Sequence, residues 1–189
     1  AKRADVDKTL DDLDVALAAE LQRALLPGRL PTDVPHQKAA ARNRMCGTVG
    51  GDFYDFIPLN DDQIAILIGD VVGHGVQAAL IMAQIAGYLR SRCAEHSRPA
   101  AAIRGLNELL MDLGRRADTV VPTTLFYAVL DAPTGLLLFV NAGHPRPFLC
   151  SREACSVAPT GPQNMLLGVE PFEPQEGCHT FRPGERLVL

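Results

Sequence analysis

The chain has 189 residues, of which 47% are hydrophobic and 21% charged, and its formal net charge is −4 at pH 7. This length allows one domain with a substantial buried core. The negative net charge argues against a nucleic-acid-binding protein, which usually presents a basic surface. Residues 1–20 are highly charged and lack the apolar segment of a signal peptide, so we expect a cytoplasmic protein.

An amphipathic pattern predicts a helix over residues 6–26. Pro27 and Gly28 then end it. Apolar residues recur in it at spacings of three and four, the period of one helical face: Val6, Leu10, Leu13, Leu17, Leu21 and Leu25. This stripe could pack on its own domain or continue a coiled coil from an upstream region, and the pattern leaves both options open.

Two helices interrupt a series of short strands in the rest of the chain. Strands joined by short turns are antiparallel, so the pattern predicts an α+β fold in which an antiparallel sheet carries two central helices. The expected elements are strands at 37–46, 53–59 and 63–69, helices at 76–92 and 100–113, strands at 124–130 and 136–140, and short strands near 148, near 180 and at 186–189.

Residues 71–89 carry no charged side chain over a length that could cross a bilayer. Polar residues and three glycines interrupt this segment, and Asp70 and Arg90 flank it. A buried helix entered through a glycine turn explains it better, so we expect no membrane span. The five cysteines show neither a CxxC pair nor a zinc-ligand spacing, and we expect them to be free buried thiols.

Two aspartates, each preceded by glycine, stand beside apolar runs. Asp52 follows Gly50 and Gly51, and Asp70 follows the apolar run 64–68 and Gly69. Two carboxylates on neighbouring strands would form an oxygen-rich site suited to Mg²⁺ or Mn²⁺. The two side chains could equally well cap turns, and the pattern alone does not decide between these readings.

Residues 73–78 also match the G-x-G-x-x-G/A turn of dinucleotide-binding proteins. That fold requires a parallel strand after the helix, with an acidic residue at its end. A second helix follows here instead, and the remaining strands pair as hairpins. We therefore reject the dinucleotide reading.

Five motifs together resemble the SpoIIE/RsbU-type serine phosphatases, which belong to the PPM (type 2C-like) metal-dependent protein phosphatases. The resemblance runs in order over nearly the whole chain. The motifs are ELQRALLP at 20–27, VGGDFYD at 49–55, GDVVGHG at 69–75, TTLFY at 123–127 and NAGHP at 141–145.

The resemblance implies a PPM-type β-sandwich of two antiparallel sheets flanked by helices. It implies that Asp52 and Asp70 are catalytic metal ligands, together with the backbone carbonyl of Val71. The cofactor would be a binuclear Mn²⁺ or Mg²⁺ centre, and a water bridging the two metals would attack the phosphorus. Members of this family continue past a strand like 185–189 to further acidic ligands, so we expect this chain to hold an incomplete site and to be weakly active or inactive.

Four residues are candidates for supporting roles. Asp55 is either a surface or turn residue or a neighbour of the site. His74, between two glycines at a helix start, could hydrogen-bond a ligand water. Asn141 and His144 either stabilise a turn or lie beside the substrate phosphate.

The resemblance also implies a partner and a domain organisation. The substrate would be a phosphorylated STAS-domain protein, an anti-sigma-factor antagonist in bacterial stress or sporulation signalling. Residues 1–30 would form a regulatory helix or linker, with a possible homodimer through it, and 31–189 the phosphatase domain, lacking its last strands. The alternative function is a partner-binding module with the PPM fold and no catalysis.

Overall fold

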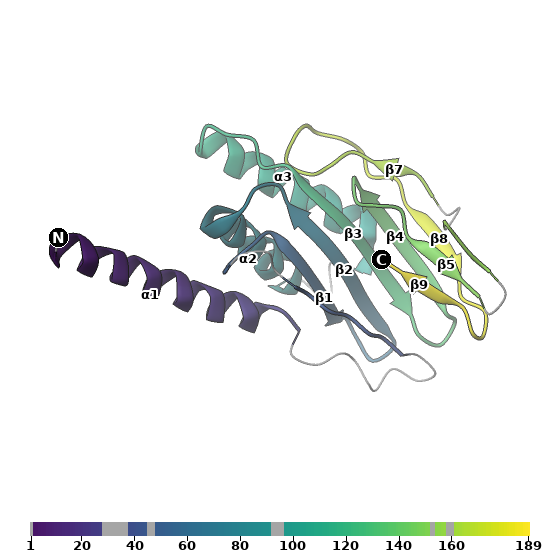
Figure 1. The fold of residues 1–189 in the computed structure, drawn as a ribbon. Coiled ribbons are helices and arrows are strands. Elements are labelled where there is room, and N and C mark those ends of the chain that lie inside the picture. The colour runs from purple at the N-terminus through teal and green to yellow at the C-terminus, as the bar shows by residue number, and fades with distance from the viewer. Residues whose placement is uncertain (1, 28–37, 45–47, 92–96, 152–153, 158–160) are drawn as a thin grey trace.

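The computed structural model of the chain describes residues 2–27, 38–44, 48–91, 97–151, 154–157 and 161–189. These ranges contain a six-stranded sheet, a three-stranded sheet and three helices. Figure 1 shows two helices covering one face of the large sheet, the small sheet on its other side, and the N-terminal helix projecting away from the body.

Two hairpins form most of the large sheet. Strand β1 (Asp52–Pro58) pairs with β2 (Gln63–Val71), and β3 (Thr123–Asp131) pairs with β4 (Leu136–Ala142), in both cases antiparallel. β2 also pairs antiparallel with β3, which joins the hairpins into one sheet. Both hairpins are confirmed, and their ends differ from the expectation by no more than two residues.

Short strands complete the two sheets. β7 (Gln163–Asn164) runs parallel to β4, and β8 (Gly177–Thr180) runs antiparallel to it. The small sheet has the order β6-β5-β9, formed by β5 (Phe148–Cys150), β6 (Cys155–Val157) and β9 (Arg186–Val188). β6 and β7 were not expected from the sequence, because strands of two or three residues carry no readable alternation.

Helices α2 (Gly75–Ser91) and α3 (Pro99–Arg116) are confirmed where they were predicted. Their apolar faces and the facing side chains of the sheet form the larger core cluster, which includes Phe53, Leu67, Met82, Ile85, Leu89, Ile103, Leu106, Leu110 and Tyr127. Burial of this surface supplies most of the stabilisation of the fold. Among the described helices, none has the length and apolarity that a bilayer crossing requires.

The opposite face of the large sheet carries a second, smaller core. Phe126 stacks on Phe139 with ring centroids 5.2 Å apart, and Leu187 of the small sheet packs against this cluster. Phe126 alternates along β3 with Tyr127, which faces the helices. The large sheet is therefore the middle layer of the molecule.

Helix α1 (Lys2–Leu25) confirms the predicted N-terminal helix and begins a few residues earlier. Leu13, Leu17 and Leu21 are 61%, 56% and 62% exposed, whereas Ala19 and Gln22 are buried. Leu13, Leu17 and Leu21 thus do not pack on their own domain, whereas Leu25 at the end of the stripe packs against the larger core cluster.

Two expectations are wrong in the described residues. A strand was expected at 37–46, but residues 38–44 form none and are largely exposed. Positions 37, 45 and 46 lie outside the described residues. The cysteines are not all free buried thiols either, since Cys150 is disulfide-bonded and Cys178 is exposed. Cys150 lies in register with Cys155 on the neighbouring strand.

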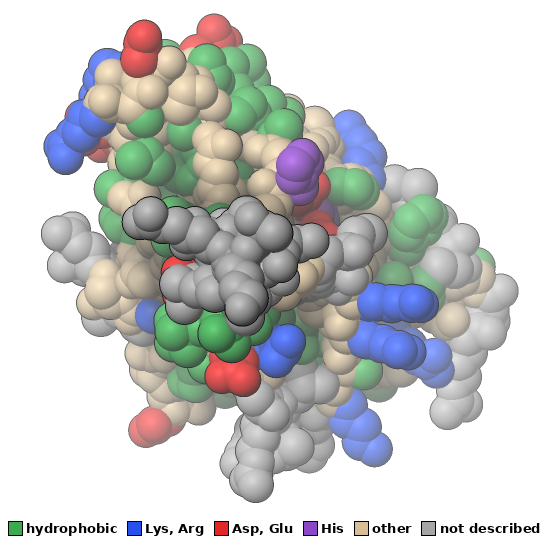
Figure 2. Space-filling view, turned by 60° about the vertical axis from the view of Figure 1, so that its left-hand side comes forward, with side chains coloured by type: hydrophobic (Ala, Val, Ile, Leu, Met, Phe, Trp, Pro, Cys, Tyr) green, Lys and Arg blue, Asp and Glu red, His purple; other side chains and the backbone are tan. Residues whose placement is uncertain are grey.

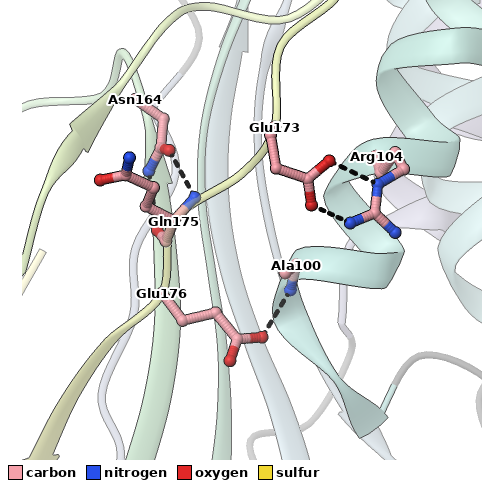
Figure 3. A network of polar contacts seen from close by, with 6 residues as sticks. All are labelled: Ala100, Arg104, Asn164, Glu173, Gln175 and Glu176. Carbon is pink, nitrogen blue, oxygen red and sulfur yellow. Dashed lines mark hydrogen bonds and ion pairs between the residues drawn. The ribbon is translucent and has the colours of Figure 1, made fainter.

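The segment between β7 and β8 is fastened to α3, as Figure 3 shows. Arg104 forms an ion pair with Glu173, and the Glu176 carboxylate accepts a hydrogen bond of 2.8 Å from the backbone N–H of Ala100 in the first turn of α3. Asn164 accepts a hydrogen bond of 2.8 Å from the N–H of Gln175. These contacts hold β7 in place beside β4.

Candidate metal centre

Asp52 and Asp70 lie opposite each other at one end of the large sheet. They are paired in register between β1 and β2, so their side chains project from the same face. Both aspartates are solvent-exposed, yet partial desolvation, the negative charge of Asp52 and a hydrogen bond between the two carboxyl groups raise the pKa of Asp70 above its usual range. Two carboxylates held this close repel one another unless a proton or a cation lies between them.

The loop before Asp52 approaches the end of β2 very closely. The N–H of Val71 donates a hydrogen bond of 3.3 Å to the carbonyl of Gly51. A Cβ at Gly51 would lie 2.4 Å from the carbonyl oxygen of Val71, so only glycine fits there. Glycine therefore allows the backbone of Val71 to lie beside the aspartate pair.

Thr124 extends the aspartate pair into a polar row across three strands. It lies in register opposite Asp70 on β3. Its hydroxyl is 3.0 Å from Nδ1 of His144, which follows β4. Burial lowers the pKa of His144, and the charge of Asp52 partly opposes this shift, so Asp52 is an electrostatic neighbour of the ring.

The backbone of His144 is held from two sides. Its N–H donates a hydrogen bond of 2.9 Å to Oδ1 of the buried Asn141, and its carbonyl accepts one of 2.9 Å from Nε2 of Gln163 on β7. Asn141 also donates a hydrogen bond from Nδ2 to the carbonyl of Pro145. Asn141 thus shapes the turn that presents His144.

The other two candidate residues lie apart from this row. Asp55 projects from the opposite face of β1, where it is buried and forms an ion pair of 2.6 Å with Arg90 of α2. Arg90 also donates a hydrogen bond to the carbonyl of Leu25. Asp55 therefore links the sheet to α1 and α2, while His74 is exposed in the turn before α2.

Gln22 connects helix α1 to the loop that carries Asp52. Its side-chain amide donates a hydrogen bond of 2.5 Å to the carbonyl of Gly50 and accepts one of 3.1 Å from the N–H of Gly50. Gln22 is buried, so water does not compete for these bonds. This contact could not be predicted from the sequence, because a glutamine in a helix pattern has no characteristic partner.

The donor chemistry of the pair fits a divalent cation. Hard oxygen ligands suit Mg²⁺ and Mn²⁺, and a cation would remove the repulsion that raises the pKa of Asp70. Within the described ranges, no three His, Cys, Asp or Glu side chains gather where they could hold a metal ion. Asp52 and Asp70 are thus the acidic donors that the described residues offer. Figure 2 shows a histidine and acidic side chains together on one face of the molecule.

Comparison with known proteins supports the phosphatase resemblance. The family model for stage II sporulation protein E (SpoIIE) matches residues 60–189. Protein IcfG of Synechocystis is 29% identical over 97% of this chain and 33% of its own length. The phosphoserine phosphatase RsbU of Bacillus subtilis is 25% identical over 93% of this chain and 51% of its own length. The chain thus spans a third to a half of these relatives.

A solved structure confirms the fold. The SiaA-PP2C domain of Pseudomonas aeruginosa matches with a TM-score of 0.67 and 21% identity, covering 96% of this chain and 71% of that one. The expected fold, a phosphatase domain of the type 2C kind with antiparallel sheets and flanking helices, is therefore correct. The opposed aspartates at the end of β1 and β2 belong to this fold rather than to a nucleotide-binding one.

Proposed function

Because the chain belongs to the SpoIIE family, we propose that it is the metal-dependent phosphatase domain of a protein serine/threonine phosphatase. The observation that carries this proposal is the opposed pair Asp52–Asp70, in which the charge of Asp52 and a hydrogen bond between the carboxyl groups help to raise the pKa of Asp70. A positively charged partner of Asp70 would lower that pKa instead. A pair of this kind is suited to cations from solution.

Asp52, Asp70 and the backbone carbonyl of Val71 would hold Mn²⁺ or Mg²⁺. When bound, the cations would activate a water molecule for attack on phosphorus and neutralise charge on the phosphoryl oxygens. The protein itself fixes the separation of the two carboxylates through the β1–β2 register and the close approach at Gly51. Asn141 and His144 would lie beside the substrate phosphate at the other end of the polar row. The exposed His74 would lie at the outer edge of the metal site.

The substrate we propose is a phosphoserine or phosphothreonine of a STAS-domain protein, an anti-sigma-factor antagonist in bacterial stress or sporulation signalling in the cytoplasm. The similarity to RsbU, which is named a phosphoserine phosphatase, supports this class of substrate. The exposed position of Asp52 and Asp70 suits a phosphorylated side chain carried by a whole protein, since such a substrate cannot enter a closed cavity.

The first experiment measures cation binding and hydrolysis together. We expect calorimetry to show binding of Mn²⁺ or Mg²⁺ to the chain, and a phosphoserine peptide to be hydrolysed slowly in their presence and not after chelation with EDTA. Because two acidic donors are described, low turnover is the expected result. Cation binding and peptide binding without any hydrolysis would instead support the partner-binding module.

Helix α1 is the proposed regulatory and dimerising element. Its exposed leucines at positions 13, 17 and 21 are spaced like one face of a helix, and a second copy of α1 could cover them. Gln22 on the same helix binds the loop of Asp52, so a change in α1 would reach the metal site directly.

We expect sedimentation equilibrium to show a homodimer and Leu17→Glu to make it monomeric, because a charge in an apolar helix seam is costly. Val169→Glu is the matched control, since Val169 is also exposed but lies outside α1. A monomeric parent chain, or equal dissociation by both variants, would rule out dimerisation through α1.

A further inference from the structure

The polar row at the end of the sheet continues beyond the two aspartates. On the face shared by Asp70 and Thr124, the neighbouring residues of β2 and β3 are Ile68 and Phe126. Phe126 belongs to the smaller core cluster, and Ile68 packs against it. The face therefore changes from apolar to polar at the last row, where Asp52, Asp70 and Thr124 lie side by side. His144 closes this row through its contact with Thr124.

The contact between Thr124 and His144 is not needed to hold the loop. Asn141 and Gln163 already bind the backbone N–H and carbonyl of His144. The 3.0 Å contact between the threonine hydroxyl and Nδ1 therefore constrains the imidazole ring itself. With Nδ1 engaged, Nε2 is the remaining polar atom through which the ring can bind a ligand.

The proposed ligand decides which ring nitrogen must carry the proton. The oxygens of a phosphate dianion accept hydrogen bonds, so Nε2 binds one only when it carries the proton. A hydroxyl that donates to Nδ1 leaves the proton on Nε2. With the proton on Nδ1 instead, Nε2 would offer a lone pair, which repels a phosphoryl oxygen.

We propose that Thr124 is a positioning residue that holds His144 in the neutral tautomer with the proton on Nε2, so that this N–H donates a hydrogen bond to a phosphoryl oxygen of the substrate. The role assigned to the phosphoryl group rests on the proposed phosphatase function. His144 is then the residue that touches the substrate, and Thr124 acts through it. The ligand chemistry is a phosphate monoester dianion, for which inorganic phosphate is a suitable probe.

The tautomer can be measured directly by ¹⁵N-edited NMR of the imidazole. We expect His144 to be protonated on Nε2 in the parent chain and in Thr124→Ser, which keeps the hydroxyl. Thr124→Val keeps the branched shape but removes the donor, and we expect a mixture of tautomers there. A proton on Nδ1 in the parent chain would overturn the proposal.

A phosphate titration tests the ligand. With Mg²⁺ present, inorganic phosphate is expected to shift the Nε2–H resonance of His144, and Thr124→Val should bind phosphate about fivefold more weakly, as expected for the loss of one oriented hydrogen bond. Thr124→Ser should restore the parent affinity. If phosphate does not shift the Nε2–H resonance of His144, the proposal is overturned. This measurement uses the parent chain, so it does not depend on whether Thr124→Val folds.

Peptide hydrolysis separates the two hypotheses. If cation-dependent hydrolysis occurs and Thr124→Val has the parent values of kcat and KM, the positioning role fails and the phosphatase function remains. If phosphate moves the Nε2–H resonance but no peptide is hydrolysed under any cation condition, the phosphate site stands and the proposed catalytic function fails.

Discussion

Asp70→Asn is expected to abolish cation-dependent hydrolysis of a phosphoserine peptide and to raise the melting temperature of the cation-free protein. The first effect follows because the substitution removes one negative oxygen ligand at nearly constant volume. Bound metals contribute several kcal/mol to phosphoryl transfer, and each 1.4 kcal/mol is a factor of ten, so we expect turnover to fall by about 100-fold or more. Cation affinity measured by calorimetry should fall with it.

The second effect follows from the raised pKa of Asp70. In the folded protein this carboxyl ionises at a higher pH than in the unfolded chain. The free energy of unfolding therefore decreases as the pH rises from the usual carboxyl range through the raised pKa, and it stays lower above it. Asparagine never ionises, so the variant should melt at a higher temperature at neutral pH and show no advantage at pH below the usual carboxyl pKa.

Asp61→Asn is the matched control for both effects. Asp61 is exposed in the turn between β1 and β2, far along the sheet from the aspartate pair. The same change of charge there should alter neither hydrolysis nor cation binding. If Asp70→Asn keeps the turnover of the parent chain, Asp70 is not a metal ligand. If the variant melts at a lower temperature than the parent at neutral pH, the two carboxyl groups do not repel one another.

The aspartate pair could be predicted because the signal is local. Asp52 and Asp70 flank a short hairpin, so the turn at 60–62 sets their register, and the sequence shows the turn. Thr124 could not be placed in the same way. Helices α2 and α3 separate β2 from β3, so the pairing of Thr124 with Asp70 depends on how the two hairpins meet in space.

Residues whose role depends on one long-range contact could not be assigned from the sequence. Asp55 is close to Asp52 in sequence, yet strand alternation places its side chain on the other face of β1. There it forms an ion pair with Arg90, a partner that the sequence does not reveal. A strand was expected at 37–46, although the pattern there is weak. Asn43 there instead donates a side-chain hydrogen bond to the carbonyl of Asp52. Propensity cannot show such a contact, because the partner lies on another element.

Gly51→Ala should have the largest effect on stability among the residues around the site. A Cβ at this position would lie 2.4 Å from the carbonyl oxygen of Val71 and 3.1 Å from its Cβ, and both neighbours are fixed by the sheet. Forcing an extra methyl group into a packed region typically costs about 1–3 kcal/mol. We expect the free energy of unfolding, measured with urea, to fall by about 2 kcal/mol for this reason.

Gly50→Ala is the neighbouring control, because a Cβ at Gly50 would meet nothing within 4 Å. We expect that variant to keep the parent stability to within about 0.5 kcal/mol. Gly51→Ala should also weaken cation binding, since the backbone must move Asp52 away from Asp70 and Val71 to relieve the clash. If both alanine variants bind cations like the parent chain, the close approach of Gly51 to Val71 serves only the packing of the sheet, and the carbonyl of Val71 is not a metal ligand.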